Sequence, residues 1–183
     1  FPEFKGESPQ VAKVLEEADK VALSKNVILL EGAQGTGKKS FSKLIHKWSN
    51  AQGEFIEIDL VGLESTEIEA TLFGNSSKEG LLKKAKGGTL FCSGVESLSQ
   101  VALGYLLDLI KKIDQNLPEY LKDCVLDMRI VLTTSGYLSL SDFKSEFDFS
   151  VKNSQTVKLT TLNELREDIR TIVSLYVKDA SKE

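Results

Sequence analysis

The glycine-rich segment Gly32–Lys39, which reads GAQGTGKK, carries the clearest chemistry in this 183-residue chain. It fits the spacing G-x-x-x-x-G-K of a phosphate-binding loop and follows the apolar run 27–30. Glycines let backbone N–H groups approach phosphate oxygens closely, and the Lys38 ammonium would bridge the β and γ phosphates. The residues predicted to bind nucleotide are Gly32, Gly35, Thr36, Gly37, Lys38, Lys39 and Ser40.

The position after the loop lysine is unusual. A Ser or Thr there normally donates its hydroxyl to Mg²⁺, whereas Lys39 has no hydroxyl. Ser40 comes one place late and would face another direction on the helix. The ligand expected is therefore ATP or ADP, with no metal ligand predicted. Alternatively, the segment has no ligand and is a glycine-rich turn that merely joins a strand to a helix.

The elements around this loop alternate between strands and helices. Apolar blocks predict strands, and 3- and 4-residue apolar spacing predicts amphipathic helices. In helix 38–48 this spacing places Phe41, Leu44, Ile45 and Trp48 inward. Such alternation predicts an α/β fold, a three-layer αβα sandwich around a parallel five-stranded sheet, with ligand at the carboxyl ends of the strands. The expected strands are 27–30, 55–60, 89–92, 128–134 and 157–159; the expected helices are 9–22, 38–48, 66–73, 101–113 and 162–177.

Composition excludes several classes of protein. The formal net charge of −4 argues against a chain that binds DNA by itself. No apolar run approaches a membrane span, and no signal peptide opens the sequence. Cys92 and Cys124 are far apart and His46 is the only histidine, which argues against a metal site or a disulfide framework. We expect a cytoplasmic protein, with Cys92 a small core residue and His46 a partly packed helix residue rather than a catalytic one.

Several short segments, in order, resemble the AAA+ central domain of sigma-54-dependent transcriptional activators, the NtrC-like bacterial enhancer-binding proteins. The loop has that family's G-x-x-G-T-G-K form. The other matching segments are Gly6–Pro9, Ile45-His46 with Ser49, Leu72–Gly74, Gly87–Phe91, Arg129–Val131, and Leu162 with Arg166–Ile169. The resemblance implies an AAA+ nucleotide-binding core over residues 1–160. Residues 161–183 would then begin the helical lid or a linker, with the lid mostly absent.

The resemblance breaks at the residues that would hydrolyse ATP. After G-G-T-L-F the family continues L-D-E, where Asp holds Mg²⁺ and Glu polarises the attacking water, but this chain has Cys92-Ser93-Gly94. Glu96 follows two residues later and is not expected to substitute. The family's sensor asparagine is replaced by Ser135. No arginine lies between Ile130 and Leu165, where the family supplies its arginine fingers.

The family's sigma-contact motif, G-A-F-T-G-A, is also missing, since a shorter segment, 75–86, joins Gly74 to Gly87. Three hypotheses remain open. The first is a nucleotide-binding regulatory or assembly module of a bacterial transcription regulator, deficient in hydrolysis and with no catalytic residue. The second is a nucleotide-free interaction or oligomerisation scaffold, and the third is an active ATPase with unusual acids. Expected partners are another copy of the chain or a transcription-machinery protein, with DNA contacted only through domains outside this sequence.

Overall fold

The computed structural model describes residues 9–24, 27–75, 78–115, 128–135 and 154–159. Within these residues a five-stranded parallel sheet has the order β2-β5-β6-β1-β7. Its strands are β1 (Ile28–Glu31), β2 (Phe55–Asp59), β5 (Thr89–Ser93), β6 (Arg129–Thr134) and β7 (Gln155–Lys158). The predicted fold class, a three-layer α/β sandwich with a parallel five-stranded sheet, is confirmed.

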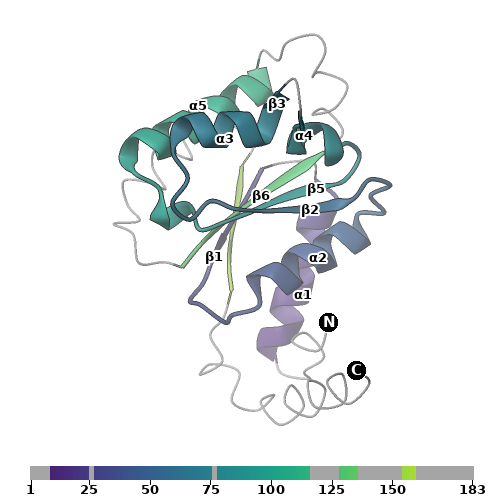
Figure 1. Cartoon of the computed structure of the whole chain (residues 1–183). Coiled ribbons are helices and arrows are strands. Elements are labelled where there is room, and N and C mark those ends of the chain that lie inside the picture. Colours follow the sequence, from purple (N-terminus) through teal and green to yellow (C-terminus); the bar gives the residue numbers. More distant parts are fainter. Residues whose placement is uncertain (1–8, 25–26, 76–77, 116–127, 136–153, 160–183) are drawn as a thin grey trace, which may run out of the picture.

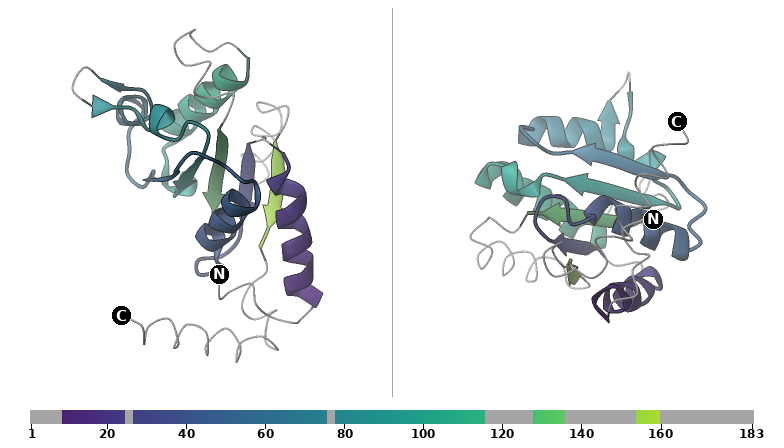
Figure 2. Two further views of the ribbon diagram at one scale, coloured as in Figure 1. Left: turned by 90° about the vertical axis from the view of Figure 1, so that its right-hand side faces the viewer. Right: turned by 90° about the horizontal axis from the view of Figure 1, so that it is seen from below.

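Helices cover both faces of this sheet (Figure 1). One face carries α1 (Pro9–Ala22) and α2 (Lys38–Trp48), and the other carries α3 (Ser65–Phe73), α4 (Leu81–Lys84) and α5 (Gln100–Gln115). A 3₁₀ turn, η2 (Val95–Ser97), follows β5, and two short antiparallel strands, β3 (Gly74–Asn75) and β4 (Lys78–Glu79), precede α4. Figure 2 shows the layers from two further directions.

Alternation along the strands divides the apolar residues between two cores. Leu29, Cys92 and Leu132 point toward α3 and α5, whereas Ile28, Phe91 and Val131 point toward α1 and α2. This pattern follows from the two-residue period of a strand and explains why the strands read as continuous apolar blocks, since both faces are buried. The phosphate loop, residues 32–38, therefore leaves β1 at the carboxyl edge of a sheet fixed from both sides.

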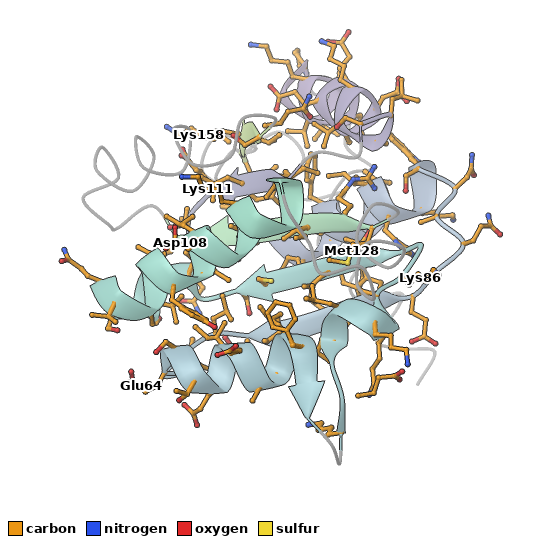
Figure 3. The ribbon with its side chains drawn as sticks, turned by 90° about the horizontal axis from the view of Figure 1, so that it is seen from above. Glu64, Lys86, Asp108, Lys111, Met128 and Lys158 are labelled. Atoms are coloured by element: carbon orange, nitrogen blue, oxygen red, sulfur yellow. The ribbon has the colours of Figure 1, made fainter. Side chains whose placement is uncertain are left out.

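The opposite edge of the sheet holds the entries to β5 and β6. Lys86 and Met128, labelled in Figure 3, precede these strands, and the two strands pair from Thr89 and Arg129 onward. Arg129 is buried and its Nη2 donates to the carbonyls of Ala22 (2.9 Å) and Ser24 (2.6 Å). The guanidinium thus ties the end of α1 to the sheet.

Most predicted elements are confirmed, with bounds shifted by one or two residues. Trp48 was expected inward with the rest of its helix, and this prediction is wrong because its side chain is 39% exposed. Trp48 is the last residue of α2, so its indole lies where the chain already turns away through Ser49 and Asn50. The predicted helix 162–177 and the lid region 161–183 fall outside the described residues.

Candidate phosphate-binding site

The root of the phosphate loop is fixed by backbone bonds to both neighbours of β1. The Gly32 N–H donates to the Thr134 carbonyl (3.2 Å), and the Leu159 N–H donates to the Glu31 carbonyl (2.8 Å). A Cβ on Gly32 would lie 2.6 Å from Thr36 Oγ1 and 3.3 Å from Leu159 Cβ. Glycine is therefore required at position 32 by close packing.

Two further glycines shape the turn into α2. Gly35 and Gly37 have φ angles of 82° and 81°, in the left-handed region that side chains disfavour. Thr36 closes the turn by donating from its hydroxyl to the Ala33 carbonyl (2.9 Å). α2 begins at Lys38, so the N–H groups at its start and the positive end of its dipole face the loop. This geometry fits a phosphate group.

The Lys38 side chain folds back over the loop. Its Nζ donates to the carbonyls of Gly32 (2.6 Å) and Ala33 (2.9 Å). Burial lowers the pKa of Lys38, and the charge of Glu96 opposes this shift. The ammonium is therefore held at the loop, with an acidic side chain nearby.

A cavity of about 620 Å³ opens beside this loop at the carboxyl edge of the sheet. Of the predicted residues, the structure places Gly35, Gly37, Lys38, Lys39 and Ser40 in its wall. Gly32 and Thr36 are not part of this wall and instead stabilise the loop through the bonds and packing described above. The remaining wall is formed by Gln34, Glu57, Ile58, Asp59, Phe91, Ser93 and Thr133.

Lys39 points toward the edge strand β2. Its Nζ pairs with Glu57 Oε2 at 2.5 Å, and Lys43, one turn later on α2, pairs with Glu57 Oε1 at 3.5 Å. Lys43 also lies over the Phe55 ring, 5.6 Å from its centroid. One carboxylate on β2 therefore holds two ammonium groups from α2.

The end of β5 presents a hydroxyl and a glycine to this cavity. Ser93 Oγ lies 3.2 Å from Asp59 Oδ1, its partner in register on β2, and 3.4 Å from the Ile58 carbonyl. Gly94 follows with a φ of 76°, and a Cβ there would lie 2.7 Å from Val61 Cγ2 and 3.0 Å from Asp59 Oδ1. This turn is built for a residue without a side chain.

Sequence reasoning missed Glu57 and Asp59 at this edge, and it named Glu96 without giving it a role there. Asp59 reaches the cavity from β2, and Glu96 approaches from η2, where its Oε1 accepts the Ser135 N–H (3.2 Å). The other oxygen of Glu96 is buried and has no hydrogen-bond partner among the described residues. The register of β2 with β5 could have indicated Asp59 once the strands were assigned. The position of Glu96 depends on the 3₁₀ turn, which the sequence pattern does not reveal.

Comparison with known proteins agrees with this architecture. The family model described as "Sigma-54 interaction domain" matches residues 4–148. The chain belongs to the sigma-54 interaction domain family. It is 28% identical over 192 residues to a Nif-specific regulatory protein of Rhodobacter capsulatus, matching 97% of this chain and 33% of that protein. It is 27% identical to the transcriptional activator RocR of Bacillus subtilis, matching 97% of this chain and 41% of RocR. The chain thus spans about a third to two fifths of these relatives.

Solved structures show the same fold as this sigma-54 interaction domain. NtrX from Brucella abortus, crystallised in complex with ATP, superposes with a TM-score of 0.75 at 23% identity, over 96% of this chain and 41% of NtrX. The P-loop NTPase domain of a sigma-54 transport activator from Escherichia coli gives a TM-score of 0.54 at 14% identity, over 82% of this chain and 97% of that one. The resemblance stated from the motifs is therefore confirmed at the level of the AAA+ domain.

The remaining candidates of this sigma-54 interaction domain have structural roles. Cys92 is 2% exposed and burial raises the pKa of its thiol to about 12, as expected for a core residue. His46 Nδ1 lies 3.0 Å from Thr89 Oγ1, and its ring meets Phe55 edge-on. Among the described residues, no group of three or more His, Cys, Asp or Glu side chains could hold a metal. No helix of the described parts is long and apolar enough to cross a membrane. Cys124 lies outside them.

Proposed function

We propose that this domain binds ATP or ADP at the phosphate loop as a structural ligand and hydrolyses it poorly, within a bacterial transcription regulator. One observation carries the proposal. The loop keeps the geometry that receives phosphate, while the strand end facing it presents Ser93 and Gly94 where the family resemblance expects two acids. Loss of a positioned general base alone costs roughly 10²–10⁴ in rate.

Glu96 is one acid near the site that could restore hydrolysis. Its Oε1 is bound to the Ser135 N–H, and its charge acts on Lys38 from the 3₁₀ turn that follows β5. In this arrangement we assign it to holding the Ser135 N–H at the end of β6. Phosphate release from ATP should therefore stay at background in the wild type and remain unchanged in Glu96→Gln. Turnover that disappears in Glu96→Gln would identify Glu96 as the base and refute the deficiency.

Binding itself is tested by calorimetric titration of the whole chain with ATP and with ADP. A ligand present at 100 times its dissociation constant stabilises the folded state by about 2.7 kcal/mol, so the midpoint of thermal unfolding should also rise. Lys38→Ala should remove both signals. Absence of heat and of any thermal shift at high concentrations of protein and nucleotide would contradict nucleotide binding.

A second candidate is a scaffold that keeps the fold without nucleotide. It is favoured by the bonds of the Lys38 ammonium to the Gly32 and Ala33 carbonyls, since a phosphate must compete with these acceptors. Under this alternative Lys38→Ala would lower the free energy of unfolding but leave partner binding or self-association intact. Sedimentation with and without nucleotide distinguishes the two candidates, because only a nucleotide-dependent module changes its assembly when ATP is added.

Contact with sigma-54 through the usual loop is not part of this proposal. Between α3 and β5 the chain forms the short β3 and β4 pair and the single turn α4, and the sequence 75–86 contains no G-A-F-T-G-A motif. Pull-down with purified sigma-54 should therefore recover no complex. Robust binding that survives replacement of residues 75–86 by a Gly-Ser linker would locate a contact elsewhere.

A further inference from the structure

The residues at the two positions where the loop pattern and the family resemblance would place Mg²⁺ ligands, Lys39 and Ser93, do not fit this ion. Mg²⁺ takes oxygen ligands in near-octahedral geometry, and an ammonium offers only donors. Lys39 stands where the loop pattern has a hydroxyl, and its Nζ is paired with Glu57. Ser93 stands where the resemblance expects an aspartate, and its hydroxyl is engaged by Asp59 and the Ile58 carbonyl. Both positions that would hold the metal are thus replaced.

The charge that Mg²⁺ would have supplied is present in another form. Lys39 lines the same cavity as Lys38, so two ammonium groups border the space beside the loop. Three carboxylates oppose the entry of a polyanion: Glu57 and Asp59 lie in the cavity wall, and the charge of Glu96 acts on Lys38. If Lys38 were the only cation lining the cavity, the negative charge of a bound triphosphate would add to that of these carboxylates. The second ammonium offsets part of this repulsion.

Lys39 is able to turn from Glu57 to a phosphate. Its side chain is 55% exposed, so the movement unpacks no core residue. Glu57 keeps Lys43 as its partner after the movement, because Lys39 contacts one oxygen of this carboxylate and Lys43 contacts the other. Exposed ion pairs contribute little to stability, whereas bonds between an ammonium and a phosphate oxygen are among the stronger hydrogen bonds. The exchange therefore favours the phosphate.

We propose that the site takes its nucleotide as the metal-free polyphosphate, with the Lys39 ammonium neutralising phosphate charge in place of Mg²⁺. This inference rests on the proposed nucleotide binding and adds the form of the ligand. The ion pair with Glu57 keeps Lys39 beside the cavity before nucleotide binds, and Lys43 remains paired with Glu57 when Lys39 moves. Lys43 is the matched control, because it shares the helix and the carboxylate but is not part of the cavity wall.

The test is calorimetric titration of the whole chain with ATP in EDTA and, separately, with excess Mg²⁺. The wild type should bind ATP in EDTA at least as tightly as in Mg²⁺. Lys39→Ser, which restores the hydroxyl, should weaken binding in EDTA about tenfold and make it tighter in Mg²⁺ than in EDTA. Lys43→Ala should change the dissociation constant less than threefold. Far-UV circular dichroism checks that each variant is folded.

Three results would overturn the inference, and they differ in what they leave standing. Wild-type binding that is tenfold or more tighter in Mg²⁺ refutes metal-free binding but supports nucleotide binding. If Asp59→Asn then removes the Mg²⁺ effect, the metal lies at Asp59. Absence of ATP binding in both buffers refutes the proposed function and this inference together. Equal losses in Lys39→Ser and Lys43→Ala would show that the effect is general surface charge.

Discussion

Gly94 offers the sharpest test of why the turn after β5 carries no side chain. This residue follows β5 with a φ of 76°, and a Cβ there would meet Val61 Cγ2 at 2.7 Å and Asp59 Oδ1 at 3.0 Å. Gly35 and Gly62 have nearly the same φ, 82° and 74°, but a Cβ on either would meet nothing within 4 Å. The three glycines therefore separate the cost of the backbone conformation from the cost of the contact.

The expected destabilisation follows from these two costs. A non-glycine residue in the left-handed region costs about 1–2 kcal/mol, which is the whole effect expected for Gly35→Ala and Gly62→Ala. Forcing an extra methyl group into a packed contact adds about 1–3 kcal/mol. Gly94→Ala should thus lower the free energy of unfolding by about 2–5 kcal/mol. Gly94→Glu should cost at least as much, because it also places a second carboxylate beside Asp59.

Urea unfolding followed by circular dichroism and by the fluorescence of Trp48 measures these differences. Nucleotide is left out, so that changes at Gly35 report stability and not ligand binding. The slope of the unfolding free energy against urea concentration must be the same in each variant before the midpoints are compared. If Gly94→Ala costs no more than Gly35→Ala and Gly62→Ala, the turn after β5 tolerates a side chain. The steric account of Gly94 would then be wrong.

Three further predictions concern groups away from the cavity. Burial raises the pKa of Cys92 from 9.0 to about 12, so above pH 9 the thiol ionises in the unfolded chain before it ionises in the folded one. Between pH 9 and pH 10–10.5 the wild type should lose about 1.4 kcal/mol more stability than Cys92→Ala. Parallel curves of unfolding free energy against pH would contradict this. Burial, aided by the charge of Arg129, lowers the pKa of His46 below 6.5, so stability should fall as the pH drops below 6.5, and His46→Gln should flatten that fall in urea titrations. Arg129→Met deprives the Ala22 and Ser24 carbonyls of their donor and should lower the free energy of unfolding by about 2–3 kcal/mol. An unchanged midpoint of thermal unfolding would show that these two bonds do not stabilise the fold.

Much of the fold could be predicted from local patterns. The strands are buried on both faces, so each appears as a short apolar run, and the 3- and 4-residue spacing marks α1, α2 and α5. Local patterns fail where tertiary context decides. The spacing places Trp48 in phase with Phe41 and Ile45, but it cannot show that the chain turns away after the last helical residue and leaves the indole 39% exposed.

The candidate site divides in the same way. The residues of the phosphate loop are contiguous, so their shared location follows from the motif. Glu57 and Asp59 belong to a strand that only the register with β5 brings to the cavity. Glu96 reaches the Ser135 N–H through a 3₁₀ turn that begins after the left-handed Gly94. No spacing rule links these acids to the loop, because their proximity is a property of the sheet and its turns.

The two bonds at the root of the phosphate loop also have a consequence for the order of folding. Gly32 is held by Thr134, and Glu31 by Leu159, so the loop's supports are synthesised long after the loop itself. Contacts this distant in sequence form late, because the intervening chain must first be closed into a loop. A nascent chain that has not yet emerged through β7 therefore displays the complete glycine motif without the frame that shapes it. If the loop binds nucleotide as proposed, acquisition of that affinity during translation would report that β7 has entered the sheet.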